Sequence, residues 1–276
     1  MIHDPLLSTD GLAALLDAPD VRIIDASWRM DGSRPGDDAP RIPGAIRFDL
    51  DAVADHASPL PLMLPSPSDF AAAVGAMGIA HDDHIVVYDE QGLFSAARVW
   101  WTFRTMGARR VQVLDGGLPK WRAEGRPVQG GPGAPLPPAV FRPDFQTSNV
   151  ADLDHVRRAM DDPAIHIVDA RPSARFLGEA VEPRAGLRSG HMPGALNVPF
   201  GDLLNADGTL RTRDELAEVF YRAGLKPDPS VITTCGSGVT AAILTLALAV
   251  LGRDSAVYDG SWAEWGARSD TPIETG

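Results

Sequence analysis

Cysteine is nearly absent from this chain, which has a single one, Cys235, among 276 residues. One thiol cannot form an intrachain disulfide, which predicts a protein of the reducing cytoplasm. Basic residues are also in the minority, with 25 Lys and Arg against 37 Asp and Glu and a net charge of -12. Such a surface repels phosphate backbones and acidic bilayers, so neither nucleic acid nor a membrane is expected as a partner.

Long hydrophobic runs are missing as well. The longest apolar stretch, residues 241–251, is too short to cross a bilayer. Residues 1–20 lack a basic segment followed by an apolar core, so no secretory signal is expected. Apolar residues (44%) and charged residues (22%) occur in proportions ordinary for a globular protein, and the length allows one large domain or two.

The sequence repeats itself once, because four segments of the first half recur in the same order in the second half. The matched pairs are VRIIDAS (21–27) with IHIVDAR (165–171), RIPGAIRFD (41–49) with HMPGALNVPF (191–200), IVVYDEQGLFSAARV (85–99) with VITTCGSGVTAAIL (231–244), and VQVLDGGLPKW (111–121) with SAVYDGSWAEW (255–265). Four matches in one order indicate a duplicated domain.

A Pro- and Gly-rich segment, RPVQGGPGAPLPPAVFRPDF, lies between the two copies at residues 126–145. This composition disfavours both helix and paired strand, so the segment is predicted to be a linker. The expected organisation is a first domain at 1–125, a linker at 126–149 and a second domain at 150–276.

Each copy alternates short β-branched runs with longer segments of helical spacing. The expected strands are 21–25, 85–88, 111–114, 165–169, 231–234 and 256–258, and the expected helices are 68–77, 96–106, 213–223 and 239–251. This alternation predicts an α/β fold in which each domain has a mostly parallel sheet flanked by helices on both faces. Reactive loops of such sheets lie at the carboxyl ends of strands, which is where Cys235 stands.

The segment TTCGSGVTAA (233–242) places Cys235 between an expected strand and an expected helix. Backbone N–H groups and the positive end of a helix dipole favour the thiolate, which is the nucleophilic form of cysteine. Gly236 and Gly238 allow the backbone to curl so that several N–H groups point at one anion. The loop therefore suits an anionic sulfur or an anionic ligand better than a merely structural buried thiol.

Two other anion-binding interpretations fit the loop less well. Residues 236–241 satisfy a degenerate dinucleotide-binding pattern, but the loop follows a late strand of its domain rather than the first. A cysteine phosphatase needs an arginine six residues after the cysteine to hold the phosphate, and that position is Ala241.

The duplicated architecture and the cysteine loop together resemble the two-domain sulfurtransferases of the rhodanese superfamily, over nearly the whole chain. Further marks are the segments IPGA (42–45) and MPGA (192–195) and the two DG…W endings. The resemblance implies a catalytically silent first domain, in which Asp89 stands where the second domain has Cys235. It also implies sulfur transfer through a persulfide, with no metal and no organic cofactor.

The residues of the cysteine loop indicate which sulfur donor is expected. Thiosulfate-type loops of the family resemble CRKGVT, whereas mercaptopyruvate-type loops resemble CGSGVT, the sequence found here at 235–240. The resemblance implies that Arg175 and Arg184 bind the carboxylate of 3-mercaptopyruvate, for which planar guanidinium forks are suited. The expected site therefore comprises the catalytic residues Cys235 and Ser237 and the substrate-binding residues Arg175, Arg184, Gly236, Gly238, Val239, Thr240 and Arg41.

Arg41 departs from the family pattern, because mercaptopyruvate-type enzymes commonly have a histidine there that forms a proton relay with the loop serine. Ser237 then lacks that partner, and an added cation facing the loop favours a dianion such as thiosulfate. A thiosulfate sulfurtransferase therefore stays an alternative. A second alternative is a non-catalytic sulfur-carrier module, which needs Cys235 but neither Arg175 nor Arg184.

The expected partners are a small anionic sulfur donor and a nucleophilic acceptor, either cyanide or a thiol such as that of thioredoxin. His81 and His84 lie three residues apart in an Asp-rich turn without a third ligand at metal-site spacing, so no metal site is expected. His191 is expected to be structural, and Trp100 and Trp101 are expected to pack in a core or an interface.

Overall fold

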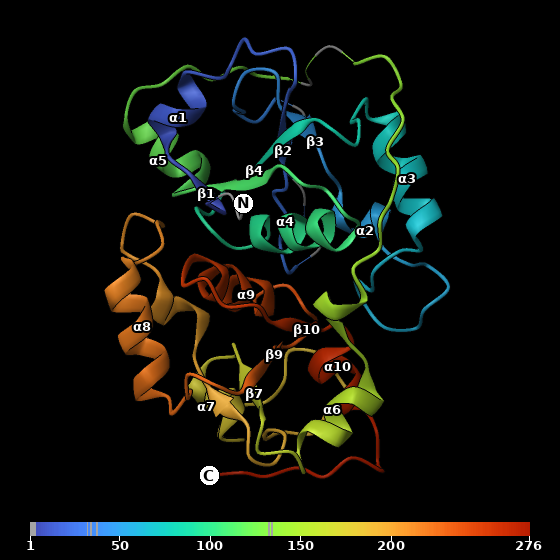
Figure 1. The fold of residues 1–276 in the computed structure, drawn as a ribbon, viewed down its shortest axis with the longest axis vertical. Helices are drawn as coiled ribbons and strands as arrows, with labels where there is room; N and C mark the ends of the chain where they lie inside the picture. The colour runs from blue at the N-terminus through green and yellow to red at the C-terminus, as the bar shows by residue number, and fades with distance from the viewer. Residues whose placement is uncertain (1–3, 32, 34, 37, 132, 134) are drawn as a thin grey trace. The chain divides into compact units, whose positions relative to one another are not determined.

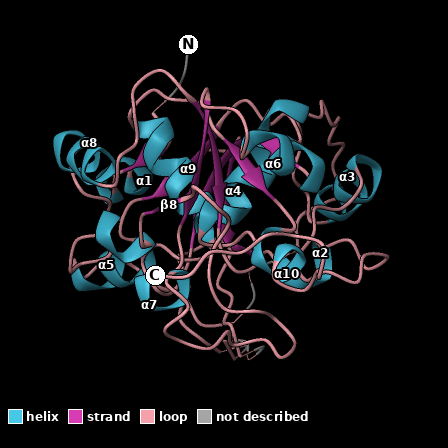
Figure 2. Cartoon of the chain, turned by 90° about the horizontal axis from the view of Figure 1, so that it is seen from below, coloured by secondary structure: helices cyan, strands magenta, loops and turns pink. Residues whose placement is uncertain are grey.

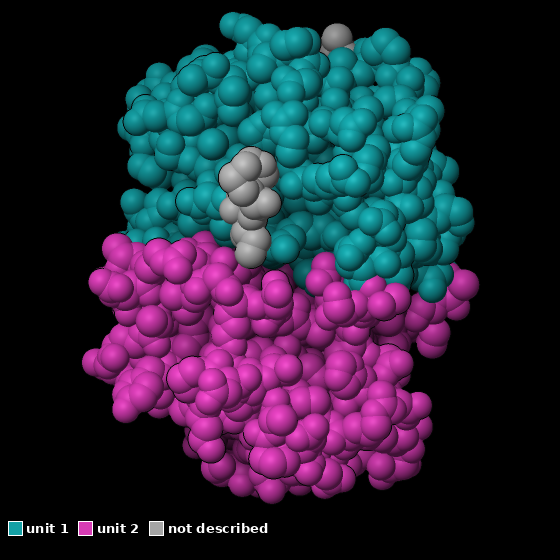
Figure 3. Space-filling view, viewed as in Figure 1, with its two compact units in different colours: residues 1–56, 64–146, 205–210 teal, residues 57–63, 147–204, 211–276 magenta. Residues whose placement is uncertain are grey.

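The computed structural model describes residues 4–31, 33, 35–36, 38–131, 133 and 135–276 (Figure 1). The chain divides into two compact units, shown in different colours in Figure 3. Unit 1 comprises residues 1–56, 64–146 and 205–210, and unit 2 comprises residues 57–63, 147–204 and 211–276. Two short segments, 57–63 and 205–210, thus belong to the unit opposite to the one that surrounds them in sequence.

Unit 1 contains a five-stranded sheet of order β1-β5-β4-β2-β3, and every pairing in it is parallel. The strands are β1 (Leu6–Leu7), β2 (Val21–Asp25), β3 (Ile46–Arg47), β4 (His84–Tyr88) and β5 (Val111–Leu114). The helices are α1 (Thr9–Ala13), α2 (Leu50–Val53), α3 (Pro67–Ala76), α4 (Ala96–Thr105) and α5 (Gly117–Ala123).

Unit 2 repeats this arrangement with a parallel sheet of order β6-β10-β9-β7-β8. Its strands are β6 (Val150–Ala151), β7 (Ile165–Asp169), β8 (Leu196–Asn197), β9 (Ser230–Thr234) and β10 (Ala256–Tyr258). Its helices are α6 (Leu153–Ala159), α7 (Ser173–Phe176), α8 (Arg213–Arg222), α9 (Ala241–Val250) and α10 (Ser261–Trp265), with short 3₁₀ turns at Thr147–Asn149 and Phe200–Leu203. The two matching topologies confirm the duplication and the α/β class predicted from the sequence.

Helices cover both faces of each sheet, because successive strand residues point to opposite sides. In unit 1, α1 and α5 pack through Leu12 and Trp121 against one face of the sheet, while α4 contacts β4 and β5. In unit 2, α6 and α10 pack through Val156 and Trp265 against one face, and α9 contacts β9 and β10. Figure 2 shows helices around the strands.

Trp100 and Trp101 lie inside this packing, as expected for core residues, and each is only 1% exposed. The indole N–H of Trp100 donates to the carbonyl of Val111 at 3.2 Å, which ties α4 to β5. The guanidinium of Arg98 lies 4.5 Å from the ring centroid of Trp101. The pair is therefore part of the unit 1 interior.

Local signals at the helix starts explain where several helices begin. The Ser66 side chain accepts from the N–H of Asp69 at the start of α3, and Thr212 and Glu215 form a reciprocal capping box at the start of α8. Helix α9 differs, since it begins at Ala241 rather than at residue 239 as its spacing predicts. Gly238 adopts a left-handed φ of 76°, which keeps residues 235–240 in a loop.

The described residues of the Pro- and Gly-rich segment form no helix or strand between 126 and 146 apart from one bridge, Gln129 to Arg41. The segment nevertheless packs on unit 1. Phe141 is 4% exposed and its ring meets that of Phe70 edge to face, and the N–H of Asp144 donates to the carbonyl of Met106. These contacts hold the segment against the unit 1 core.

Within the described part of the chain, none of the helices combines the length and the apolar character needed to span a bilayer. Even α9, which is apolar at nearly every position, has only 10 residues. Its apolar side chains are instead buried against its own sheet.

Leu246→Ala should lower the free energy of unfolding by about 2–5 kcal/mol, because it removes a buried side chain and leaves a cavity. Leu246 is 0% exposed in the middle of α9. Urea-induced unfolding followed by circular dichroism measures the change. The control is Val181→Ala, at a side chain that is 85% exposed, which should change stability by less than about 0.5 kcal/mol. Equal losses in both variants would contradict the described packing of α9.

Candidate active site

Cys235 begins a six-residue loop between the end of β9 and the start of α9. Strand β9 is the middle strand of the unit 2 sheet, so the loop lies at the carboxyl edge between the ends of β7 and β10. The Cys235 residue is only 2% exposed, and it is the one thiol of the chain. The fold therefore places the predicted nucleophile where ligands bind in open parallel sheets.

The first two carbonyls of the loop are held by helix α10. The N–H of Trp262 donates to the carbonyl of Cys235 at 2.9 Å, and the N–H of Ala263 donates to the carbonyl of Gly236 at 2.9 Å. The N–H of Cys235 in turn donates to the hydroxyl of Ser261 at 3.4 Å. These bonds turn the carbonyl oxygens toward α10 and away from the rest of the loop.

The remaining N–H groups of the loop are available to a ligand. Within the described residues, four of them donate to no protein acceptor, namely those of Gly236, Ser237, Val239 and Thr240. Unpaired N–H groups on a largely buried loop carry a desolvation cost that an anion removes. The Ser237 hydroxyl lies in the same loop, in a residue that is 7% exposed.

The equivalent loop of unit 1 shows how such N–H groups are satisfied. Asp89 follows β4 directly, and its Oδ1 accepts from the N–H of Gln91 at 2.8 Å. Its Oδ2 accepts from the N–H groups of Phe94 at 2.7 Å and Ala96 at 2.9 Å. Burial raises the pKa of Asp89, and the backbone donors act against that rise. This completely buried carboxylate thus occupies a cradle of backbone amides.

The strand registers make the two loops directly comparable. Asp25 pairs with Tyr88 as Asp169 pairs with Thr234, so Asp89 is the counterpart of Cys235. By the same alignment Ser237 is the counterpart of Gln91 and Thr240 is the counterpart of Phe94, and the N–H groups of Gln91 and Phe94 both donate to Asp89. Unit 1 supplies its own anion to these amides, whereas unit 2 offers them next to a thiol.

Arg175 reaches the cysteine loop from the single turn of α7. A Cβ placed on Gly236 would lie only 3.2 Å from Nη2 of Arg175, so the guanidinium lies directly against the loop. Its Nε donates to Oε1 of Glu182 at 3.2 Å, and its Nη2 also donates to that carboxylate. The structure therefore brings Arg175, predicted to bind the substrate, to the loop that Cys235 begins.

Arg184 is half-buried in the segment between α7 and β8. Within the described residues it forms no hydrogen bond or ion pair with protein groups, so its guanidinium is available to an anion. Its predicted contact with a donor carboxylate stays a prediction.

Arg41 is 5% exposed and belongs to unit 1. Its Nε lies 3.8 Å from Oδ2 of Asp25, and its peptide pairs with that of Gln129. Its predicted role toward a donor also stays a prediction. The counterpart in unit 2, His191, stacks on Phe176 with ring centroids 3.8 Å apart.

Charged groups behind Arg175 were not singled out in the sequence. Glu182 also accepts from Nη1 of Arg171 at 2.8 Å, and Arg171 donates to Asp169 at 2.7 Å. Burial alone would lower the pKa of Arg171, but the two carboxylates raise it above the ordinary value, so the guanidinium stays charged. The only sequence signal was the position of Asp169 and Arg171 at the end of a strand.

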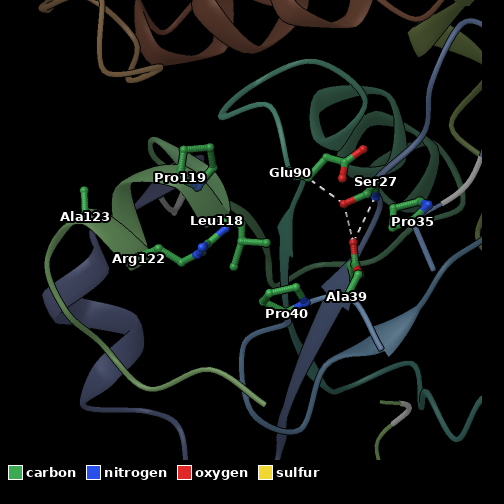
Figure 4. Close-up of a pocket in the computed structure, with 10 residues that line it drawn as sticks. Ser27, Pro35, Ala39, Pro40, Glu90, Leu118, Pro119, Arg122 and Ala123 are labelled. Carbon is green, nitrogen blue, oxygen red and sulfur yellow. Dashed lines mark hydrogen bonds between the residues drawn. The ribbon is translucent and has the colours of Figure 1, made fainter. Parts of the chain in front are cut away.

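A cavity of about 470 Å³ lies beside the Asp89 loop in unit 1 (Figure 4). Its polar walls are bound to one another, because the Ser27 hydroxyl donates to Asp25 and accepts from the N–H of Glu90. The Glu90 carboxylate is paired with Arg29 at 2.5 and 2.9 Å.

The two histidines of the Asp-rich turn are engaged elsewhere. Nε2 of His84 lies 2.8 Å from Oε1 of Gln112, and His81 meets the ring of Phe141 edge to face. Among the residues that the structure describes, no cluster of three or more His, Cys, Asp or Glu side chains is arranged to hold a metal ion.

The rhodanese-like domain family matches the chain twice, at residues 8–124 and 152–268. The chain belongs to the rhodanese family. It is 44% identical over 274 residues to 3-mercaptopyruvate sulfurtransferase of Escherichia coli (strain K12), with 97% of each chain covered. It is 40% identical over 286 residues to thiosulfate sulfurtransferase of Bos taurus, with 100% of this chain and 95% of the relative covered.

Solved structures show the same rhodanese fold. The crystal structure of SseA from Escherichia coli, described as a 3-mercaptopyruvate sulfotransferase, superposes with a TM-score of 0.84 at 41% identity, covering 94% of this chain and 99% of the other. Tum1 from Saccharomyces cerevisiae gives a TM-score of 0.90 at 30% identity, covering 100% and 99%. The tandem rhodanese architecture predicted from the sequence is confirmed. Family membership favours sulfur transfer over the dinucleotide and phosphatase interpretations of the loop.

Asp89→Ala should lower the free energy of unfolding by about 3 kcal/mol, because the buried N–H of Ala96 and the partly buried N–H groups of Gln91 and Phe94 lose their acceptor. Thermal or urea-induced unfolding measures the loss. Asp82→Ala, at an exposed position of the same rhodanese domain, is the control and should change stability by less than about 0.5 kcal/mol. A wild-type stability in Asp89→Ala would show that the carboxylate is dispensable to the loop.

Proposed function

We propose that this protein is a 3-mercaptopyruvate sulfurtransferase that carries the transferred sulfur as a persulfide on Cys235. The observation that carries the proposal is the set of loop amides without a protein acceptor beside the chain's one thiol. Backbone donors that are already oriented stabilise developing negative charge without reorganising. An outer sulfur on Cys235 is an anion of the size and position that the carboxylate takes in unit 1.

The first half-reaction forms the persulfide. The Cys235 thiolate attacks the sulfur of 3-mercaptopyruvate, an S–S bond forms, and the C–S bond breaks with its electron pair going to carbon. The pyruvate enolate takes the proton that was on the donor sulfur and leaves as pyruvate, and the outer sulfur of Cys235 becomes an anion. The N–H groups of Gly236, Ser237 and Thr240 then donate to it, with the Ser237 and Thr240 hydroxyls as further donors.

The second half-reaction returns the enzyme to its starting state. A thiolate or cyanide attacks the outer sulfur, the S–S bond breaks toward Cys235, and a new persulfide or thiocyanate leaves. The free Cys235 thiolate is regenerated, and the enzyme undergoes no net oxidation or reduction over the cycle. Because the donor product leaves before the acceptor reacts, the kinetics should be ping-pong.

The choice of donor rests on charge around the loop. The sequence CGSGVT leaves positions 236 and 237 without a cation, so the donor carboxylate requires a cation from outside the loop. Arg175 lies against Gly236 and is 18% exposed, and Arg184 is available in the following segment. A 2-oxo acid fits such paired guanidinium donors.

Thiosulfate is the second candidate donor. The buried cation Arg41 replaces the histidine expected in mercaptopyruvate-type enzymes, and extra positive charge favours a dianion. In that reaction sulfite leaves in place of pyruvate and the same persulfide forms. A sulfur-carrier module without a small-molecule donor is the remaining alternative, and it requires Cys235 alone.

The acceptor and the location are further parts of the proposal. A thiol acceptor such as thioredoxin is proposed because the outer sulfur of a persulfide reacts with thiolates. The cytoplasm is proposed because the chain has one cysteine and no disulfide. A relative from Arabidopsis thaliana that is 42% identical over 297 residues is named as mitochondrial.

Sulfur transfer to cyanide with 3-mercaptopyruvate and with thiosulfate in parallel tests the proposal. The wild type should show at least about tenfold higher kcat/KM with 3-mercaptopyruvate, because its carboxylate has guanidinium partners and the loop itself is neutral. Cys235→Ser should remove turnover with both donors. Preference for thiosulfate would replace the proposed donor, and absence of turnover with either would favour the carrier module.

A further inference from the structure

We propose that Glu182 is a positioning residue that sets donor specificity, because it holds Arg175 in the space that the missing side chain of Gly236 leaves open beside Cys235. This inference deepens the proposed function and rests on it for the identity of the donor. It assigns a role to a carboxylate that touches neither the thiol nor the donor.

The position of the Arg175 guanidinium is set by Glu182. Every hydrogen bond that the Arg175 side chain makes within the described residues goes to the Glu182 carboxylate, from Nε and from Nη2. Helix α7 is a single turn without a side-chain cap, so its backbone offers little restraint on a long side chain. Nη1 and one N–H of Nη2 remain to bind a donor carboxylate.

Glu182 is itself held rigidly from behind. Its side chain is 1% exposed and accepts from Arg171 at 2.8 Å. Arg171 is fixed by Asp169, by the carbonyl of Gly190 at 2.9 Å, and by the face of Trp262, whose ring centroid lies 4.1 Å away. Such a network holds a buried carboxylate in one place.

The charges in this network alternate and sum to zero. Asp169, Arg171, Glu182 and Arg175 follow one another as minus, plus, minus and plus. The first three side chains are each 1% exposed, whereas Arg175 is 18% exposed. The row therefore presents one oriented cation at the cysteine loop and leaves no unpaired charge in the interior.

Gly236 provides the room for this cation. A Cβ at position 236 would lie 3.2 Å from Nη2 of Arg175, which is tighter than ordinary contacts. A loop of the CRKGVT kind places a long cationic side chain at that position, so the Arg175 guanidinium would have to shift by a few tenths of an ångström from where it lies. The glycine in CGSGVT and the Glu182–Arg175 pair thus act together. The loop carries no cation at position 236, and the network places the Arg175 guanidinium there for a planar carboxylate.

The decisive experiment compares two donors in Glu182→Gln. This change keeps the size of the side chain but replaces an oxygen acceptor of Arg175 by an amide NH₂, which cannot accept. KM for 3-mercaptopyruvate should rise about tenfold or more with kcat within about threefold, because uniform binding of the carboxylate is lost. kcat/KM for thiosulfate should stay within about threefold. Glu182→Asp, which keeps the charge, should recover part of the preference.

Two controls separate positioning from a general loss of structure. Glu179→Gln, an exposed carboxylate three residues away, should leave both donors unchanged. Gly236→Ala should weaken 3-mercaptopyruvate more than thiosulfate, and in an Arg175→Ala background both Gly236→Ala and Glu182→Gln should have little further effect. Equal losses for both donors in Glu182→Gln, or full additivity with Arg175→Ala, would overturn the inference.

A turnover-independent measurement distinguishes this inference from the proposed function. Pyruvate carries the same carboxylate and 2-oxo group as the donor, so it should protect Cys235 against alkylation by iodoacetamide. The concentration of pyruvate needed for half protection should rise about tenfold in Glu182→Gln. If the wild type does not turn over 3-mercaptopyruvate but this protection shift occurs, the proposed function fails and the role of Glu182 stands. If turnover occurs but the shift does not, the role of Glu182 fails.

Discussion

Backbone N–H groups gathered at the carboxyl end of the central strand need hydrogen-bond acceptors in both halves of this protein, and the rest of the structure depends on how each half supplies them. In unit 1 the Asp89 carboxylate accepts three of them and is completely buried. In unit 2 the matching loop holds Cys235, and four of its amides, those of Gly236, Ser237, Val239 and Thr240, have no protein acceptor within the described residues. The loop of unit 1 thus satisfies its own amides with a side chain, whereas the loop of unit 2 presents its amides next to a thiol.

The duplicated scaffold makes this difference possible. Both loops follow the middle strand of a five-stranded parallel sheet, and both have their first carbonyl held by the helix after the next strand. The N–H of Leu118 donates to the carbonyl of Asp89 at 3.0 Å, as that of Trp262 donates to Cys235 at 2.9 Å. The loop backbone is therefore anchored in the same way whichever side chain it carries, and the side chain alone decides between structural and chemical use.

Electrostatics around Cys235 follow a different principle, because the cation comes from outside the loop. A buried row of alternating charges ends at Arg175, which is the most exposed of its members. Burying a charge is tolerated only when partners surround it. Arg171 meets this condition because it pairs with Asp169 and Glu182. The Glu182 carboxylate, which Arg171 holds in place, also pairs with Arg175. In the role proposed for Glu182, donor selection depends on this network as well as on the residues of the loop.

The sequence alone determined the duplication, the parallel α/β class and the position of Cys235 after β9, because these follow from local patterns and a repeated order of motifs. The candidate Arg175 came from the resemblance to the rhodanese superfamily. Tertiary structure decided what depends on groups far apart in the chain. Glu182 looks like an ordinary acidic residue until folding buries it between Arg171 and Arg175, and α9 starts later than its apolar spacing predicts because the loop needs residues 235–240. Segments 57–63 and 205–210 likewise join a unit that their neighbours in sequence do not indicate. Local structural propensity depends on adjacent residues, whereas burial and charge pairing depend on residues that only the folded chain brings together.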